Sequence, residues 1–586
     1  MQRDPVVPRV VPDLLRHSAR LVPDRIAVAC GPVELTFAEL DARANAFAAG
    51  LRARGVRRGD RIALVFSGAH WPDFVVAYFG TLQLGAAALL LGDRFSAGDV
   101  RGVAARHRVA GVVAATELIP AEPELGCWIA DAATVVKGHD THPVPIDAEP
   151  SDAADVVFTS GTTAEPRGIV ATHANVVRAQ PNWPTGPRAN QPGLHALPLG
   201  SVAGQIHLVN SVGGQHTLVL LPAFDVAELG RRVEQYGVLS VFLVPAMAHW
   251  LVRTPAGDRP VLPGVRGVHF SGAPLPVGVL PDLPAVFPNA AFYNFYSSTE
   301  AFPARVATRF DPDRPDSVGR PAGTHQVRIT APDRPDVPLP AGEVGAVWLR
   351  SAAAPARRFL QQEDEHGEGA GFRDGWTRTG DLGHLDADGY LYLDGRTADI
   401  VNVGGFNVST FRVEEALRAH EAVADAAVCP VDHPVLGEVV AAFVVLRADA
   451  TVRELRQHAA GRLSRRELPA IVRCVEDLPR NPAGKVVKSQ LPALLDNPGP
   501  ASFVAARTPV ERAVAEVWAD VLDLGSVGVD DNFFELGGDS LTAVEAAAQL
   551  RSRHGLTVDA VTILELTSLS DLADHLAAHL ASEGTS

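Results

Sequence analysis

The stretch that most constrains this 586-residue chain lies near its C-terminus and reads Asp531-Asn532-Phe533-Phe534-Glu535-Leu536-Gly537-Gly538-Asp539-Ser540-Leu541. From its end onward, apolar residues recur at helical spacing, at Leu541, Val544, Ala547 and Ala548. We therefore expect a helix that begins near Ser540, just after two glycines and an aspartate. A serine at such a position is often only a helix N-cap, but an exposed hydroxyl there is also well placed to carry a covalent group.

The sequence on both sides of Ser540 favours the second interpretation. Residues 509–522 have a helical pattern, residues 530–534 lead into the site, and residues 564–569 precede a last predicted helix. In this order the segment resembles the phosphopantetheine attachment site of acyl and peptidyl carrier proteins, and Ser540 matches the serine that takes the arm. The resemblance implies an all-α four-helix carrier domain at residues 508–582, which holds acyl groups as thioesters on 4'-phosphopantetheine.

Charge is concentrated in this C-terminal segment. Residues 508–586 contain 14 Asp and Glu against 3 Arg, so they carry −11 of the total formal charge of −16. Because the apolar residues keep helical spacing, we expect a folded acidic domain and not a disordered tail. An acidic domain should bind partners with basic patches, and it argues against nucleic acid as a partner.

Length and composition set broader limits. A chain of 586 residues is too long for one core, and 47% hydrophobic with 20% charged residues is typical of soluble globular proteins. The four cysteines have no close pair, which argues against a disulfide framework or a zinc site. No apolar signal core follows Met1, and the nearly apolar run at residues 82–91 is too short to span a bilayer. We therefore expect a cytoplasmic protein with no membrane partner.

A second informative stretch reads Val156-Val157-Phe158-Thr159-Ser160-Gly161-Thr162-Thr163-Ala164-Glu165-Pro166-Arg167-Gly168. It predicts a short strand of β-branched and aromatic residues that runs into a loop of hydroxyls and glycines, followed by a proline and a cation. Hydroxyls and backbone N–H groups can hold phosphate oxygens, and glycine lets the backbone come close. The stretch lacks the G-x-x-x-x-G-K-[ST] pattern of the Walker loop, and taken alone it could be an ordinary loop.

Further motifs follow in a fixed order: Asn294–Glu300, Trp376–Gly383, Tyr392–Arg396, Gly404–Val408 and Leu478–Val486. Together with residues 156–168 they resemble the adenylate-forming superfamily of acyl-CoA synthetases, luciferases and nonribosomal peptide synthetase adenylation domains, over about residues 10–491. The resemblance implies a large α/β adenylation domain. Its N-terminal core subdomain of sheets and helices would span residues 1–396 and its small mobile α+β C-terminal subdomain residues 397–491, followed by a linker at 492–507.

The resemblance also implies an ATP and Mg²⁺ site. Tyr296 would stack on adenine, Asp381 and Arg396 would bind the ribose, and Thr299 would hydrogen-bond phosphate, while Glu300 would help to hold Mg²⁺. The β- and γ-phosphates would lie against a loop formed by Thr159, Ser160, Gly161, Thr162, Thr163 and Arg167.

Catalysis is assigned to a lysine in the C-terminal subdomain. Lys485 would contact the carboxylate being activated and the charge that develops at the α-phosphate. The subdomain would then swing about a hinge at Ala398, withdraw Lys485, and bring Gly404 and Gly405 in to line a tunnel for the pantetheine thiol.

Three positions depart from the pattern of the family. Ala164 replaces the usual glycine of the phosphate loop, and Arg167 replaces the usual lysine but keeps its charge. Ala398 stands where the hinge usually carries Asp or Lys. Because hinges absorb backbone rotation, alanine need not prevent the swing, but these changes raise the alternative of a protein with weak or lost activity.

The substrate pocket, by rough alignment, carries no acidic residue. Family members that activate α-amino acids usually place an aspartate near Ser201 to hold the ammonium, and an unpaired buried ammonium would be costly. We therefore expect an acid without a free α-amino group, such as an aryl, hydroxy or short acyl acid, with a β-amino acid still open. The expected lining is Ser201, Val202, Gln205, Phe242, His269, Ser271, Phe295, Pro303 and Ala304; His269 could equally be an interior histidine.

These motifs predict an ATP-dependent acid–thiol ligase that loads its own carrier domain in a nonribosomal peptide or polyketide-type natural-product pathway, such as antibiotic biosynthesis. No condensation signature or hydrolase elbow is found. Expected partners are a phosphopantetheinyl transferase and a downstream condensing, modifying or acyl-transfer enzyme in trans. Two alternatives stay open: an interaction protein whose carrier is loaded in trans, and an acyl-CoA ligase that uses free CoA.

Overall fold

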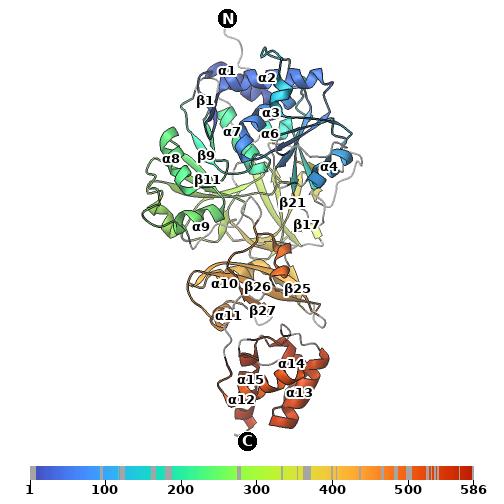
Figure 1. The fold of residues 1–586 in the computed structure, drawn as a ribbon, viewed down its shortest axis with the longest axis vertical. Helices are drawn as coiled ribbons and strands as arrows, with labels where there is room; N and C mark the ends of the chain where they lie inside the picture. The colour runs from blue at the N-terminus through green and yellow to red at the C-terminus, as the bar shows by residue number, and fades with distance from the viewer. Residues whose placement is uncertain are drawn as a thin grey trace. The chain divides into compact units, whose positions relative to one another are not determined.

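The computed structural model divides the chain into two compact units, residues 1–393 with 482–484, and residues 394–481 with 485–586 (Figure 1). The residues that it describes are 8–92, 95, 97–115, 118, 126–159, 167–178, 186, 188–272, 279–321, 323–331, 334–352, 354, 356–360, 371–396, 400–403, 406–433, 437–463, 467–480, 486–495, 505–522, 527–529, 531–533, 536, 540–566 and 568–583.

Two large sheets of mainly parallel strands form the frame of unit 1. Sheet A has the order β14 (Val306–Arg309), β13 (Ala291–Tyr296), β12 (Gly267–Phe270), β11 (Ser240–Leu243), β9 (Gly193–His195), β10 (Leu218–Leu220), β1 (Ile26–Cys30) and β2 (Val33–Thr36). Sheet B has the order β19 (Arg358–Phe359), β8 (Arg167–Thr172), β7 (Ala153–Thr159), β4 (Ala87–Gly92), β3 (Arg61–Phe66), β5 (Gly111–Ala114) and β6 (Trp128–Ala130).

A third sheet in unit 1, sheet C, is antiparallel. Its order is β15 (Ser317–Gly319), β22 (Leu391–Arg396), β21 (Trp376–Leu385), β18 (Gly345–Ser351), β16 (His325–Ala331) and β17 (Arg334–Pro338), with β20 (Phe372–Arg373) paired to β21. The helices of unit 1 are α1 (Val11–Leu21), α2 (Phe37–Ala53), α3 (Trp71–Gln83), α4 (Ala97–Arg106), α5 (Ala132–Val136), α6 (His173–Arg178), α7 (Val202–Gly214), α8 (Val226–Tyr236) and α9 (Pro245–Arg253), with the short 3-10 turns η1 (Gly68–His70) and η3 (Leu280–Ala285).

Sheets A and B enclose a layer of helices. Helix α3 is buried along almost its whole length. It belongs to one hydrophobic cluster that contains Leu64 and Leu90 of sheet B as well as Val28 and Leu218 of sheet A. The opposite face of sheet B is covered by α4, and the opposite face of sheet A by α8 and α9. Because helices cover both faces of each sheet, most strand positions are apolar, and the strand predicted at residues 156–158 is part of β7.

Helix starts follow local sequence signals. Thr36 with Glu39, Thr451 with Glu454, and Thr508 with Glu511 each form a reciprocal capping box before α2, α11 (Val452–Ala460) and α12 (Pro509–Val521). In each box the threonine hydroxyl accepts the backbone N–H of the glutamate, and the carboxylate accepts the N–H of the threonine. These caps satisfy N–H groups that the helix itself leaves without acceptors.

Unit 2 begins with a small mixed sheet, sheet D, as expected for the α+β subdomain. Its order is β24 (Phe406–Ser409), β23 (Ile400–Val403), β26 (Gly437–Leu446) and β25 (Val423–His433), with β27 (Ile471–Cys474) paired to β26. Helices α10 (Thr410–Arg418) and α11 pack on one face through Val413, Leu417 and Leu455. On the other face lie residues near the short turns η6 (Lys488–Gln490) and η7 (Pro492–Leu494), including Leu491.

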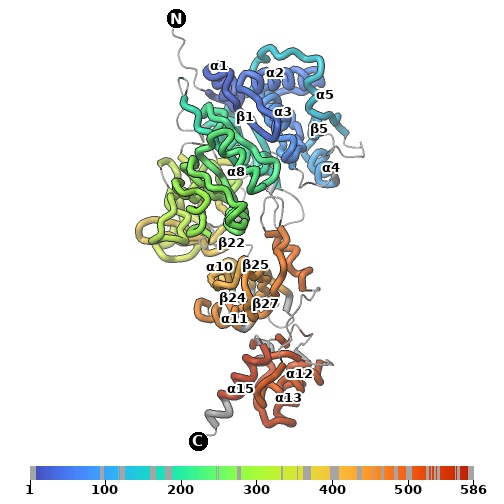
Figure 2. Tube along the Cα trace, turned by 60° about the vertical axis from the view of Figure 1, so that its left-hand side comes forward, coloured from blue at the N-terminus to red at the C-terminus, as the bar shows by residue number. Residues whose placement is uncertain are grey.

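The C-terminal part of unit 2 has the helices predicted for a carrier domain. They are α12, α13 (Ser540–His554), α14 (Ala560–Glu565) and α15 (Leu569–Glu583), shown in red in Figures 1 and 2. Their shared core centres on Trp518, whose ring meets Phe533 edge-on with centroids 4.9 Å apart. The prediction of an all-α four-helix domain is confirmed, and α13 begins at Ser540.

Among the described residues, no helix is both long and apolar enough to cross a membrane. The apolar run at residues 82–91 is the end of α3 and most of strand β4. All four cysteines are free thiols, and the described part of the chain contains no cluster of His, Cys, Asp and Glu suited to a metal ion.

Two fully buried histidines of unit 1 act as hydrogen-bond acceptors. His173 Nδ1 accepts the N–H of Val11 (3.2 Å), and His195 Nδ1 accepts the N–H of Leu197 (3.1 Å). Burial lowers the pKa of His173 to about 4, although Asp152 opposes this, and lowers the pKa of His195 to about 3. Both imidazoles are therefore neutral at pH 7.

We predict that unit 1 loses stability as the pH falls. Between the unfolded pKa of about 6.5 and the folded values, the unfolded chain binds more protons, so the free energy of unfolding decreases with decreasing pH. Each histidine should lower the free energy of unfolding by about 2 kcal/mol when the pH falls from about 7.5 to 5. Urea unfolding of unit 1 at a series of pH values, monitored by pulse proteolysis, measures this pH dependence of the free energy of unfolding.

The matched variants are His195→Gln, which should flatten the slope, and His142→Gln at an exposed position, which should leave it unchanged. An identical slope in the wild-type protein and the His195→Gln variant would contradict the assignment.

Candidate active site

Two residues expected to bind the nucleoside of ATP meet in unit 1. Tyr296 ends strand β13 and Asp381 lies on β21, so they come from different sheets. The Tyr296 hydroxyl donates to Asp381 Oδ2 over 2.6 Å and lies 3.1 Å from Thr379 Oγ1. Both side chains are nearly buried, and the Thr379 hydroxyl is itself fixed on Val347 O (3.0 Å). The tyrosine ring and the carboxylate are therefore held in one place before any ligand binds.

The expected phosphate loop connects two paired strands. β7 and β8 are antiparallel, and their last pair joins Thr159 to Arg167, so both ends of residues 160–166 start from one point. Arg167 is exposed. Ser160, Gly161, Thr162, Thr163 and Ala164, and the side chain of Thr159, lie outside the described residues.

The segment that contains Thr299 and Glu300 is closed by local hydrogen bonds. Ser297 Oγ donates to Ala304 O (2.7 Å), and the N–H of Phe302 donates to Ser298 O (3.1 Å). Asn175 of α6 donates from Nδ2 to Phe302 O (3.1 Å), which ties this segment to the helix after β8. The expected metal ligand Glu300 is thus joined to the phosphate hairpin by a side chain that was not predicted.

A buried carboxylate, Asp155 on β7, was also not predicted. Its Oδ2 accepts hydrogen bonds from Tyr78 OH (2.8 Å) and Gln205 Nε2 (2.6 Å), and the residue is fully buried. The sequence signal was a single acidic residue inside an apolar strand, between Ala154 and Val156. Burial raises the pKa of Asp155, although Arg357, Tyr78 and Gln205 oppose the increase.

The partner charge is Arg357, which is 2% exposed and lies just before β19. Its Nε donates to Asn175 Oδ1 (3.2 Å), and its guanidinium lies over the ring of Phe302 at 5.4 Å. Burial lowers the pKa of Arg357, and the negative charges of Asp155 and Glu300 oppose this decrease. Nη1 and Nη2 are buried and make no hydrogen bond within the described structure. Arg357 therefore links Asp155 electrostatically to the segment of Glu300.

The predicted acyl pocket contains a row of aromatic rings. Phe242, His269 and Tyr293 are in register on β11, β12 and β13, and adjacent rings stack with centroids 4.7 Å and 5.1 Å apart. Phe295 adds a tilted ring 5.6 Å from His269. Burial lowers the pKa of His269 to about 4, so the row is uncharged at pH 7. His269 Nδ1 is buried and makes no hydrogen bond to any described group.

Two other predicted pocket residues have structural hydrogen bonds. Ser201 caps α7: its Oγ accepts the N–H of Gly204 (3.1 Å) and donates to Pro198 O (2.7 Å). A Cβ on Gly204 would lie 2.2 Å from Pro198 O, so this turn requires glycine. Gln205 is buried, and its Nε2 donates hydrogen bonds to Asp155 and Tyr78. Val202 and Ser271 are half-buried, whereas Pro303 and Ala304 are buried.

Several predicted residues of unit 2 lie outside the described part of the chain. These are Lys485, the hinge residue Ala398, and the tunnel residues Gly404 and Gly405. Gly404 and Gly405 connect β23 and β24, whose last pair is Val403 with Phe406. Arg396 is the last residue of β22, and its side chain is not described. Ser540 is the first residue of α13, and Gly537, Gly538 and Asp539 before it are outside the described residues.

Comparison with protein families assigns three consecutive parts of the chain. Residues 15–356 match the model of the AMP-binding enzyme family, residues 412–485 match the AMP-binding enzyme C-terminal domain, and residues 512–576 match the phosphopantetheine attachment site. These matches confirm the predicted order of an adenylate-forming enzyme followed by a carrier domain.

Individual relatives fall into two groups. The chain is 31% identical, over 99% of its length, to a probable non-canonical nonribosomal peptide synthetase, CymA, of Salinispora arenicola, and it spans only 8% of that protein. It is 29% identical to 2-succinylbenzoate–CoA ligase of Bacillus licheniformis, matching 82% of this chain and 99% of the ligase.

Among solved structures, o-succinylbenzoate coenzyme A synthetase (MenE) of Bacillus subtilis, in complex with ATP and a magnesium ion, superposes with a TM-score of 0.72 at 27% identity. The matched region covers 82% of this chain and 99% of MenE. The two buried residues Tyr296 and Asp381 and the hairpin of β7 and β8 fit such a nucleotide site. We conclude that the chain belongs to the AMP-binding enzyme family and continues, after the C-terminal domain of that family, into a phosphopantetheine carrier domain.

Proposed function

We propose that the enzyme activates a carboxylic acid without a free α-amino group and transfers it to the phosphopantetheine arm on Ser540 of its own carrier domain. The observation that carries this proposal is the order of the three family matches within one chain, in which a phosphopantetheine attachment site follows both domains of an AMP-binding enzyme. A phosphopantetheinyl transferase installs the arm, and a downstream condensing, modifying or acyl-transfer enzyme takes the acyl group in trans.

The reaction has two steps. A carboxylate oxygen of the substrate attacks the α-phosphorus of ATP, the bond to the bridging oxygen of the β-phosphate breaks, and pyrophosphate leaves. The pantetheine sulfur then attacks the acyl carbon, the bond to the AMP oxygen breaks, and the thiol proton is released. The residues of this chain contribute position and charge: Tyr296 and Asp381 hold the nucleoside, Glu300 helps to hold Mg²⁺, and Lys485 stabilises charge at the α-phosphate.

The pocket residues support a substrate with a flat, uncharged side chain. The rings of Phe242, His269 and Tyr293 present stacked faces, and no described pocket residue is an acid free to bind an ammonium group. The buried acid that contacts the predicted pocket residue Gln205 is Asp155, and it is already engaged by Gln205, Tyr78 and the charge of Arg357. We therefore favour aryl acids.

A second candidate function is acyl-CoA synthesis with free CoA. The match to 2-succinylbenzoate–CoA ligase over 99% of that enzyme favours it. The presence of a carrier domain favours transfer within the chain. The Ser540→Ala variant distinguishes the two candidate functions. This variant should release pyrophosphate normally and form no protein-bound thioester; full turnover of acid with free CoA would support the second candidate.

The main prediction is that the pantetheinylated protein gains the mass of one acyl group when it is incubated with Mg·ATP and an aryl acid. Intact-protein mass spectrometry over a panel of aryl, hydroxy, short acyl and α-amino acids measures this gain. No gain with any acid, combined with loading of Ser540 by a separate ligase, would instead identify an interaction protein loaded in trans.

Replacement of the expected catalytic lysine should affect the two steps differently. Lys485→Ala should slow ATP–pyrophosphate exchange by about 10²–10³-fold, because the developing charge loses its cation. Transfer from a supplied acyl-adenylate to the arm should be almost unchanged. Equal losses in both half-reactions would refute the role given to Lys485.

A further inference from the structure

The segment that carries Lys485 is closed at its base. Arg480 and Val486 form an antiparallel bridge, and the N–H of Val487 donates to Pro479 O over 2.8 Å. The five residues between them, 481–485, lie outside the described part of the chain. The described residues that flank this segment include Arg480 on one side and Lys488 on the other, and each of them is held by a carboxylate.

The first end is held by a carboxylate on sheet D. The guanidinium of Arg480 pairs with Asp425 Oδ2 on β25, and both side chains are about three-quarters buried. Asp425 Oδ1 accepts a hydrogen bond from Arg418 Nε (2.9 Å) on α10. Burial alone would raise the pKa of Asp425, but Arg418 and Arg480 hold it below its usual value, so the carboxylate is charged at pH 7.

The second end is held by a carboxylate on α10. Lys488 Nζ lies 2.8 Å from Glu414 Oε1 and donates to Thr410 Oγ1 at 2.8 Å. Glu414 is almost fully buried, and its Oε1 also accepts the N–H of Val428 (2.9 Å). A buried carboxylate fixed by a backbone N–H offers Lys488 a rigid partner.

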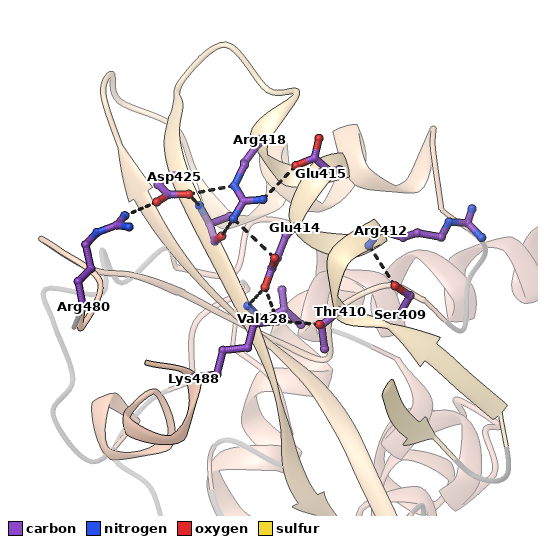
Figure 3. Close-up of polar contacts among 11 residues, drawn as sticks. Ser409, Thr410, Arg412, Glu414, Glu415, Arg418, Asp425, Val428, Arg480 and Lys488 are labelled. Carbon is purple, nitrogen blue, oxygen red and sulfur yellow. Dashed lines mark hydrogen bonds and ion pairs between the residues drawn. The ribbon is translucent and has the colours of Figure 1, made fainter. Parts of the chain in front are cut away.

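One arginine connects the two carboxylates, as Figure 3 shows. Arg418 contacts Asp425 through Nε and Glu414 through Nη2 (3.6 Å), and it also pairs with Glu415 (3.0 Å). Three cations, Arg418, Arg480 and Lys488, are thus balanced by three carboxylates. We name this set the anchor cluster: Glu414, Glu415, Arg418, Asp425, Arg480 and Lys488.

We propose that Arg480 and Lys488 are positioning residues for Lys485: through Asp425 and Glu414 they fix both ends of its segment on one rigid face of sheet D and α10. This assignment rests on the proposed function, in which Lys485 acts in adenylation and leaves the site during transfer. A cluster that only stabilised the subdomain would affect both half-reactions alike. A cluster that aims the lysine should affect adenylation alone.

The test compares Arg480→Gln with the matched control Arg412→Gln in the pantetheinylated full chain. Arg412 lies on α10, the helix of Glu414 and Arg418, has a 52% exposed side chain and pairs with Glu467 (3.0 Å), which is not part of the anchor cluster. We expect Arg480→Gln to lower kcat of pyrophosphate exchange up to about 10²-fold, with little change in KM and with acyl transfer from a supplied adenylate within about 2-fold. Arg480→Lys should recover part of the loss, and Arg412→Gln should match the wild-type protein.

A double-variant cycle makes the test specific. In the Lys485→Ala background, Arg480→Gln should add no further loss, because the group that it positions is gone. A full additional loss, or equal losses in both half-reactions of the single variant, would overturn the proposal.

Hydrogen–deuterium exchange supplies a readout that needs no substrate. Arg480→Gln should speed exchange of the amide of Val487, which donates to Pro479 O at the base of the segment, whereas unchanged exchange would overturn the anchoring. If the wild-type protein exchanges pyrophosphate with no acid, the proposed function fails, and the anchoring is still decided by this measurement.

Discussion

A carboxylate inside a protein needs compensation, and in unit 1 this constraint acts at Asp155. The residue lies on a strand buried on both faces, where an unpaired charge would be costly. Its compensation comes from three places in the chain: Tyr78 on α3, Gln205 on α7 and the guanidinium of Arg357. The middle helix layer, the helix that opens the acyl pocket and the edge of sheet B therefore meet at one carboxylate.

This arrangement joins helix α7, where the acyl pocket was predicted, to the hairpin of β7 and β8, where the phosphate loop was predicted. Gln205 belongs to α7, whereas Asp155 lies four residues before Thr159, the last residue of β7. From Arg357 the contacts continue through Asn175 to Phe302, two residues after Glu300. Because buried polar groups are costly to separate, a displacement of α7 would be resisted at the base of the phosphate hairpin. Helix α7 and the hairpin of β7 and β8 thus belong to one connected network.

Much of the fold and site could be predicted because the signals are local. Capping boxes, apolar runs and helical spacing depend on residues a few positions apart, so the helices after Thr36 and Thr508 and the start of α13 at Ser540 could be read from the sequence. The chemical motifs also placed Tyr296 and Asp381 in one nucleotide site, and the structure brings these two side chains within hydrogen-bond distance.

Contacts between distant residues could not be predicted in this way. The sequence shows a single acid in a strand at Asp155, but nothing in the spacing names Arg357 as its partner. Alignment placed Ser201 and Gln205 in the pocket, yet their polar atoms serve a helix cap and a buried acid, because those local demands exist whether or not a ligand is bound. The motif that contains Lys485 includes Arg480, but its partner Asp425 is revealed only by the pairing of β25 with the rest of sheet D.

The division of these groups between two units has a chemical consequence. Tyr296, Thr299, Glu300 and Asp381 belong to unit 1, whereas Lys485 and the carboxylates that hold its neighbours belong to unit 2. In the proposed mechanism the lysine is needed while charge develops on the α-phosphate, whereas the thiol needs room at the acyl carbon afterwards. If the anchors of the lysine segment were in unit 1, withdrawing the lysine would require breaking buried ion pairs in every turnover. Because Asp425 and Glu414 are in unit 2, the proposed withdrawal would carry the lysine away together with its anchors, and the ion pairs of the cluster would stay intact through both steps.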